Sequence, residues 1–257
     1  SVELLTREGE IEIAKRIEDG LKHMIMAIAA CPTTIAEILR LAEKIEREEM
    51  RIDEVVDGLI DPNAPEEAVA EELAEEEMEE DLGGEESEDD DGAIQSAALL
   101  QLKSDALERF ATIRVLYNKM IKTLAKNGSR SRPYLKTQEE ISEELMFIRF
   151  AAKQVEALCD GLRGLVEEVR SYERAIMELC VEKAAMPRPY FIKTFPGNEE
   201  DLNWVGREVG SRKPYSEVLS RFAPAILEQQ QSLIDLQKRV GIPVKDLKEI
   251  NRQMSTG

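Results

Sequence analysis

The sequence has 257 residues and carries 53 Asp and Glu against 34 Lys and Arg, a formal net charge of −19. This balance excludes a uniformly basic protein that wraps nucleic acid or is held on anionic membranes by charge. Between Asp61 and Asp91 there are 17 acidic residues and no basic one, so the remainder of the chain is close to neutral. Hydrophobic residues make up 42%, which is ordinary for globular proteins and predicts one or two domains with a core.

The cysteine pattern and the absence of long apolar runs bear on the compartment. Cys31, Cys159 and Cys180 are odd in number and form no CxxC pair, so the sequence predicts neither a disulfide framework nor a thiolate zinc site. No apolar run reaches the ~18 residues that a membrane span needs. We therefore predict a cytoplasmic protein that does not bind membranes. Because the chain starts at Ser1 without methionine, we interpret it as a piece of a longer protein.

Two amphipathic helices are predicted in the first sixty residues. Apolar side chains recur at helical spacing in two series that a Cys31-Pro32 break separates. Thr6 is the expected N-cap of the first helix, and Thr33 or Thr34 that of the second. The first series consists of Ile11, Ala14, Ile17, Leu21, Met24 and Ile28.

The acidic segment between residues 61 and 92 is predicted to be a disordered linker. Glu, Asp, Ala and Gly dominate it, and its few larger apolar groups are too few to offset the entropy of ordering. A coil of this length separates its ends by roughly 30 Å. An entropic spacer is one interpretation of this segment, and a mimic or repellent of DNA is the other.

Helical periodicity continues through the second half of the chain. The apolar steps from Leu99 to Leu124 predict one long helix that closes near Asn127-Gly128. The pattern resumes at Ile141 and runs to Leu179, which would be a helix of about 60 Å if unbroken.

The last part of the chain begins with an irregular stretch between Pro187 and Pro214 that is rich in aromatic residues. A further helix contains Pro224, which predicts a kink or a start there, and a last short helix follows Pro243. No segment alternates with the period of a strand. The predicted fold class is all-α, an elongated bundle of long amphipathic helices with a disordered acidic linker.

No constellation of residues predicts catalysis or a cofactor. His23 is the only histidine, so a His-based triad or metal centre has no second member. Gly161-Leu-Arg-Gly164 matches neither phosphate-binding glycine motif and lies inside a helical pattern. The cysteines fall on apolar helix faces and are interpreted as small buried hydrophobes. We predict a helical interaction protein, not an enzyme, with no cofactor, metal or small-molecule substrate.

One compact basic loop stands out in this acidic chain. It contains Lys126, Arg130, Arg132 and Lys136, with Tyr134 among them. Such a cluster is a candidate for contact with phosphates, and an ordinary solvated turn is the alternative interpretation.

Three segments resemble a known family. The stretch Val2-Glu-Leu-Leu-Thr-Arg-Glu-Gly-Glu-Ile-Glu-Ile-Ala-Lys-Arg-Ile-Glu18 resembles the second half of region 1.2 of the primary, housekeeping sigma factors of bacterial RNA polymerase. Glu173-Arg-Ala-Ile-Met-Glu-Leu-Cys-Val-Glu182 and Asp246-Leu-Lys-Glu-Ile-Asn-Arg-Gln-Met-Ser255 resemble the helical, non-conserved insertion of proteobacterial members. The resemblance implies three parts: region 1.2-like helices and the start of the insertion at 1–60, the acidic linker at 61–92, and the insertion at 93–257, ending just before region 2.

The resemblance also implies a function. Such a subunit joins the core RNA polymerase, directs it to promoters and has no catalysis of its own. Region 1.2 would contact the non-template strand of promoter DNA near the −10 element and the discriminator, where a flipped base is bound. The insertion would touch the clamp of the largest polymerase subunit and aid promoter escape.

Individual site residues follow from the same resemblance. Glu10 stands where the family places a carboxylate that lines the base pocket, and Leu5, Thr6 and Arg7 lie on the same turn. A carboxylate can accept a hydrogen bond from a base edge. For Glu10, the alternative is an acid near a helix start that favours the helix dipole. For the whole chain, the alternative is a non-catalytic helical scaffold that binds a partner helix, with the acidic run as a spacer.

Overall fold

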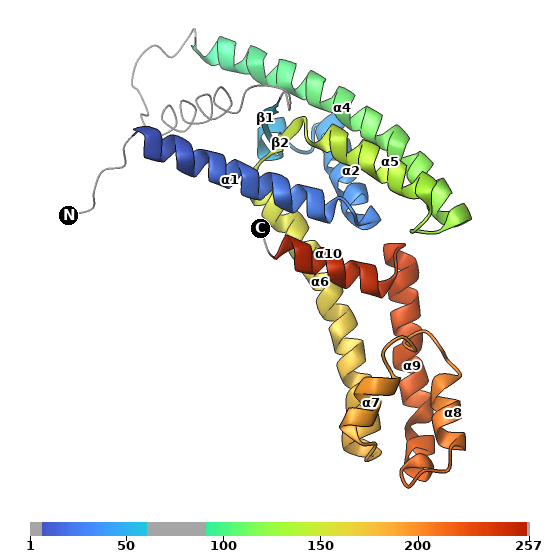
Figure 1. Cartoon of the computed structure of the whole chain (residues 1–257). Helices are drawn as coiled ribbons and strands as arrows, with labels where there is room; N and C mark the ends of the chain where they lie inside the picture. Colours follow the sequence, from blue (N-terminus) through green and yellow to red (C-terminus); the bar gives the residue numbers. More distant parts are fainter. Residues whose placement is uncertain (1–6, 61–90, 256–257) are drawn as a thin grey trace, which may run out of the picture. The chain divides into compact units, whose positions relative to one another are not determined.

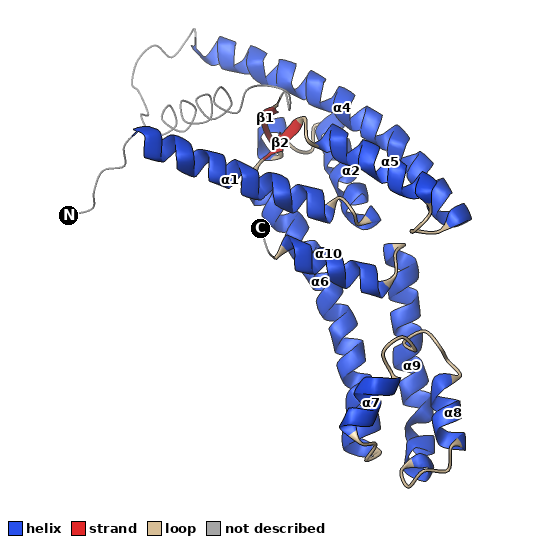
Figure 2. Cartoon of the chain, in the orientation of Figure 1, coloured by secondary structure: helices blue, strands red, loops and turns tan. Residues whose placement is uncertain are grey.

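The computed structural model describes residues 7–60 and 91–255 (Figure 1). Helices dominate these residues, which confirms the all-α fold class, and the regular strands among them are two short ones (Figure 2). The predicted acidic linker lies outside the described residues, except that its last two residues, Asp91 and Gly92, are helical.

The chain divides into two compact units. The first contains the described residues up to Gly161 together with those from Ile250, and the second is Leu162–Glu249. Two helices, α6 (Ala152–Met177) and α10 (Val244–Met254), contribute residues to both units.

The first unit opens with α1 (Arg7–Ile28) and α2 (Pro32–Glu46), which confirms the predicted break at Cys31-Pro32. Cys31 occupies the N-cap position of α2, and Pro32 follows at its start. The prediction that Thr33 or Thr34 caps this helix is wrong. Proline has no N–H to lose at the first helical position and its ring already holds a helical φ, so the helix begins before the threonines.

A helical hairpin, formed by α4 (Asp91–Asn127) and α5 (Arg132–Leu145), completes most of this unit (Figure 1). The end of α4 agrees with the prediction, because Gly128 adopts a left-handed φ of 82° there and its N–H bonds Leu124 O at 2.9 Å. Helix α2 packs on α4. Fully buried side chains from these three helices form the core, among them Ile35, Ile38, Ile45, Phe110, Ile113, Met120, Ile141 and Leu145.

A small antiparallel sheet interrupts the helical pattern. Strand β1 (Val56–Leu59) follows a 3-10 turn, η1 (Ile52–Glu54), and pairs with β2 (Ile148–Phe150). Val56 lies opposite Phe150 and Leu59 opposite Ile148, with an irregularity between Val56 and Gly58. Backbone bonds from Ile60 N to Phe147 O (2.8 Å) and from Ala151 N to Val55 O (3.0 Å) extend the pairing.

The sheet contradicts two expectations, the absence of strands and a helix that continues unbroken from Ile141 to Leu179. Ile148 and Phe150 are both buried, although residues two apart point to different sides of a helix. A local strand places both on one face, and the segment Val56–Leu59 supplies the hydrogen-bond partners. That partner lies about ninety positions earlier in the chain, so the local pattern carried no sign of it.

The second unit contains most of α6, a π-helical turn η2 (Glu178–Lys183), and helices α7 (Arg188–Thr194), α8 (Trp204–Gly210) and α9 (Ser216–Val240). Helix α6 passes through Gly161 and Gly164, and α9 passes through Pro224. Gly241, at φ 87°, ends α9 before the last helix, as predicted.

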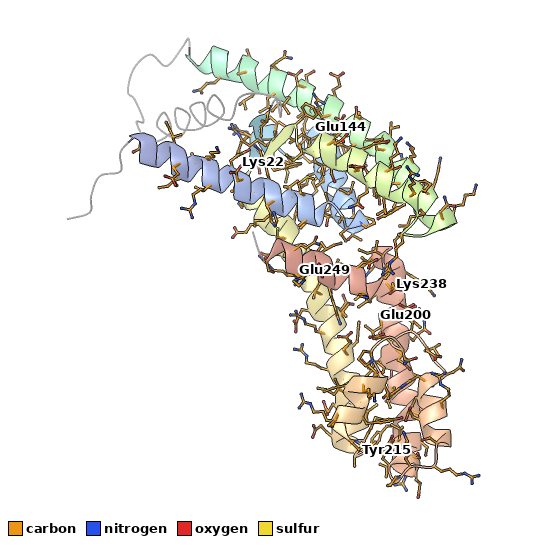
Figure 3. All side chains as sticks on the ribbon, in the orientation of Figure 1. Lys22, Glu144, Glu200, Tyr215, Lys238 and Glu249 are labelled. Carbon is orange, nitrogen blue, oxygen red and sulfur yellow. The ribbon has the colours of Figure 1, made fainter. Side chains whose placement is uncertain are left out.

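The aromatic cluster of the irregular stretch forms a core in this unit. Phe195 stacks on Phe191 at 4.9 Å between ring centroids and meets Trp204 edge-on at 5.0 Å. The fully buried Gln230 of α9 donates from Nε2 to the carbonyls of Asn198, Glu199 and Asp201, which ties the loop before α8 to α9. Tyr215, labelled in Figure 3, lies next to the start of α9.

Candidate functional site

The residues implied by the region 1.2 resemblance lie at the start of α1. Leu5 and Thr6 are outside the described residues, and Arg7 is the first residue of the helix. Glu10 is on its first turns with a partly exposed side chain. This position is compatible with both interpretations of Glu10. A partly exposed carboxylate can contact a base, and an acid near a helix N-terminus interacts favourably with the helix dipole.

Helix α1 turns an unexpected face to the core. Ala14, Glu18 and Ile25 are buried, and Glu18 pairs with Lys22 at 3.6 Å. Ile17 was expected in the buried seam, but it is 51% exposed. Glu18, paired with Lys22, takes a core-facing position that the apolar series gave to Ile17. The side of α1 that faces the core is therefore rotated about the helix axis from the side that the apolar series predicts.

That rotation creates an exposed stripe. Glu10, Ile13 and Ile17 follow one another at steps of three and four residues, so they share one side of α1. Ile13 is 41% exposed and Ile17 is 51% exposed. A carboxylate thus sits at the end of an apolar strip, an arrangement suited to a partner that offers both a polar edge and apolar surface. The sequence pattern did not single out Ile13, since its helical series put other residues on the buried face.

The predicted basic loop lies at the tip of the α4–α5 hairpin, and all four of its cations are exposed. Lys126 is in the last turn of α4, and Arg132 and Lys136 are in the first turns of α5, with Arg130 between the helices. The structure therefore brings the four together. Tyr134 differs from the expectation, because its side chain is only 2% exposed and belongs to the core.

Lys122 belongs to the same group, although it was not among the four cations predicted from the loop sequence. It is exposed and lies one helical turn before Lys126. We call the set Lys122, Lys126, Arg130, Arg132 and Lys136 the basic tip. A count of charge along the sequence would have found it, since residues 109–138 contain eight basic residues and no acidic one.

The other cations of this run are neutralised by neighbouring helices. Arg109 donates to Glu144 of α5 at 3.1 Å, and Lys119 pairs with Glu140 at 3.3 Å (Glu144 is labelled in Figure 3). Arg114 donates to Glu43 of α2 at 2.6 Å, and this hydrogen bond lowers the pKa of the Glu43 carboxyl. These pairs serve the packing of the hairpin.

A surface groove of about 510 Å³ lies between the loop after α2 and the first turns of α4. Carboxylates line it together with Arg51 and Lys103, and both cations have partners, since Arg51 pairs with Asp53 at 2.5 Å and Lys103 with Glu48 at 3.6 Å. The lining combines these pairs with apolar side chains such as Leu99 and Leu100. It holds no histidine and no cysteine.

The described part of the chain contains no candidate metal site and no exposed thiol. No group of three or more His, Cys, Asp or Glu side chains among these residues could hold a metal ion. All three cysteines are buried, as predicted. Burial raises the pKa of the Cys180 thiol to about 12, so it stays protonated at neutral pH.

No single helix among residues 7–60 and 91–255 is both long and apolar enough to cross a bilayer. Gly9–Ile28 and Pro32–Glu46 reach that length and composition only together, and they are bent by 113° at the break between them.

Comparison with known proteins gives three findings. Residues 31–237 match the family model described as the sigma-70 non-essential region, and residues 1–23 match that of sigma-70 factor region 1.2. The chain is 42% identical to the RNA polymerase sigma factor RpoD of Neisseria gonorrhoeae over 98% of its own length. It spans about 41% of the length of that relative. A family model thus matches most of the chain, which confirms the resemblance seen in the sequence: the chain belongs to the sigma-70 family.

Proposed function

We propose that this chain is the part of a bacterial sigma factor that carries region 1.2 and the helical insertion, and that it acts in transcription initiation. The longer protein joins core RNA polymerase in the cytoplasm and directs it to promoters. The observation that carries this proposal is the pair of family matches, at residues 1–23 and 31–237, in one chain. The proposed parts are 1–60, with region 1.2-like helices and the start of the insertion, 61–92 as an acidic linker, and 93–257 as the insertion.

Within this function, α1 is the proposed DNA-contacting element. The partly exposed Glu10 would accept a hydrogen bond from a base of the non-template strand near the −10 element and the discriminator. A carboxylate is repelled by phosphates, so it selects a base edge and not the backbone. The exposed Ile13 and Ile17 on the same side of α1 offer apolar surface next to it. Leu5, Thr6 and Arg7 precede Glu10 and are proposed neighbours of the same base.

The insertion is proposed to act on the polymerase. It would touch the clamp of the largest core subunit and aid promoter escape, as the resemblance implies. Long helices with an apolar inner side and a charged outer side, such as α4 in the first unit and α9 in the second, suit such a contact.

Substitution of Glu10 tests the DNA contact. In the longer protein with core polymerase, we expect Glu10→Ala to shorten the lifetime of open promoter complexes about tenfold, because a charge-assisted hydrogen bond contributes roughly 1.5–3 kcal/mol. Glu12→Ala is the matched control, since Glu12 is exposed two residues further on and points to the other side of α1.

Both variants should bind core polymerase as the parent does. If Glu10→Ala leaves open-complex lifetimes unchanged, the base contact is wrong and Glu10 serves only the helix dipole. If neither the parent nor the variants start transcription with core polymerase, the proposed function itself is wrong.

A further inference from the structure

The basic tip of the α4–α5 hairpin is an isolated cationic surface on an acidic protein. The chain carries a net charge of −19, yet the 30 residues from Arg109 to Gln138 hold eight basic residues and no acidic one. Three of these cations pair with carboxylates of α2 and α5. Lys122, Lys126, Arg132 and Lys136 make no ion pair with any residue in 7–60 or 91–255.

The fold gathers these cations at one place. Helices α4 and α5 run antiparallel, and Lys119 lies opposite Glu140 at 3.3 Å. Lys122 and Lys126, one and two turns beyond Lys119, therefore lie opposite the first turns of α5, which carry Arg132 and Lys136.

The turn itself holds the two helices close together. Gly128 ends α4, and its carbonyl accepts hydrogen bonds from the Ser131 hydroxyl at 2.9 Å and the Ser131 N–H at 3.3 Å. The buried Tyr134 anchors the start of α5 in the core. The backbone that carries these charges is thus held in place by the turn, which lowers the entropy lost when the charges bind a partner.

We propose that the basic tip binds the phosphate backbone of duplex DNA. Several exposed Lys and Arg side chains without interleaved acids match the regularly spaced negative charges of a duplex. Near the cations of the basic tip, the only exposed large apolar side chain is that of Leu135, which is 49% exposed. One such side chain gives too little apolar surface for the desolvated centre of a protein interface.

Single-stranded nucleic acid fits the basic tip less well. Proteins that bind single strands stack bases on exposed aromatic rings. The aromatic residue of this turn, Tyr134, is 2% exposed and so offers no such ring. The contact is consequently independent of base sequence and serves double-stranded DNA.

This inference deepens the proposed function, since it rests on the longer protein working on promoter DNA, but it concerns a different surface from α1. Region 1.2 would contact unwound DNA through a carboxylate, whereas the basic tip would hold the duplex by charge. Because the whole chain carries a net charge of −19, the tip alone binds DNA weakly, and its contribution is largest where other contacts already hold the DNA nearby.

The test compares two fourfold variants of equal charge. One replaces Lys126, Arg130, Arg132 and Lys136 with Gln. The control replaces four exposed cations of the second unit, Arg188, Lys193, Arg212 and Lys238, with Gln. Binding of the full 257-residue chain to a fluorescent 30-base-pair duplex is measured by anisotropy at several salt concentrations from about 20 mM.

We expect the basic-tip variant to lose about tenfold or more in affinity and the slope of log K against log salt to fall by about 3, roughly one per phosphate contact. The control variant should keep the slope of the parent. Equal behaviour of the two variants, or no binding by the parent, would overturn the proposal.

Two competitors decide the class of partner. A single strand of the same length should compete less well than the duplex, and polyglutamate of matched charge should compete less well still. Preference for either competitor would overturn the assignment to duplex DNA. Transcription started by the longer protein with core polymerase is measured separately, so loss of the proposed function and loss of this DNA contact are distinguishable.

Discussion

At the scale of single residues, a charged side chain can take the core-facing position that the apolar pattern assigns to its neighbour. Glu18 illustrates this, because a carboxylate that is only 7% exposed takes a core-facing position on α1 beside Lys22. The partner cation offsets part of the cost of burying this carboxylate. As a result Ile17 turns outward, and the proposed stripe of Glu10, Ile13 and Ile17 exists. Hydrophobic periodicity places Glu18 on the solvent side of the helix, so it does not predict that Glu18 is buried and Ile17 exposed.

The Glu43–Arg114 pair gives a prediction for pH dependence. The hydrogen bond from Arg114 lowers the pKa of Glu43 in the folded protein from its ordinary value of 4.5. The contribution of this carboxylate to stability is therefore complete above pH 4.5 and is lost as the pH falls through the lower pKa of the folded state. We expect Glu43→Gln to lower the melting temperature at pH 7 and to match the parent in strong acid.

Glu46→Gln is the control for this measurement, because Glu46 is exposed one turn further along α2. Thermal melts of the parent and both variants from pH 7 down into strong acid check the prediction. A deficit of Glu43→Gln that stays constant over this range would mean that the carboxylate's charge is irrelevant.

At the scale of elements, the sheet formed by β1 and β2 is the feature that local sequence could not reveal. Phe150 is 3% exposed and its ring meets that of Phe110 on α4 at 6.3 Å between centroids. Through this contact β2 becomes part of the core of the α4–α5 hairpin, and the chain is extended, not helical, between α5 and α6. The register is set by residues far apart in the sequence, so only the assembled core specifies it.

Truncation of Phe150 tests the importance of this pairing. We expect Phe150→Ala to lower the free energy of unfolding by about 3–5 kcal/mol, as is usual for a buried phenylalanine. Leu59→Ala, on the partner strand, is the control, because Leu59 is 38% exposed and should cost under about 1 kcal/mol. Urea unfolding followed by circular dichroism measures both. Similar losses for the two variants would show that the sheet, and not the buried ring, carries the stability.

At the scale of the whole molecule, the charge is divided into a strongly acidic segment and a nearly neutral remainder. Fifteen acidic residues lie between Pro62 and Asp90, so removing this segment changes the net charge from −19 to −4. We expect the chain, carrying a fluorescent label, to bind core RNA polymerase saturably. If the segment is a spacer, the affinity for the polymerase should change little at 150 mM salt when the segment is removed, because no contact is lost.

Titration at two salt concentrations, with the intact chain and the shortened chain side by side, makes this measurement. A large, salt-dependent loss of affinity in the shortened chain would make the acidic segment a polymerase contact and would contradict the spacer interpretation. An absence of binding by either chain would contradict the proposed clamp contact of the insertion.

The sequence by itself determined the all-α class, the break at Cys31-Pro32, the ends of α4 and α9 at glycines, the burial of the cysteines and the family. These features depend on local periodicity, on the backbone freedom of Gly128 and Gly241, and on short motifs, all of which act within a few residues. The four loop cations of the basic tip were likewise visible in the sequence.

The tertiary structure alone decided the β1–β2 pairing, the outward turn of Ile17 and the burial of Tyr134. Each of these is a competition between side chains for a limited core, or a hydrogen-bonded pairing across a long stretch of chain. Their outcome depends on contacts between residues that are distant in sequence, where local propensity has no influence.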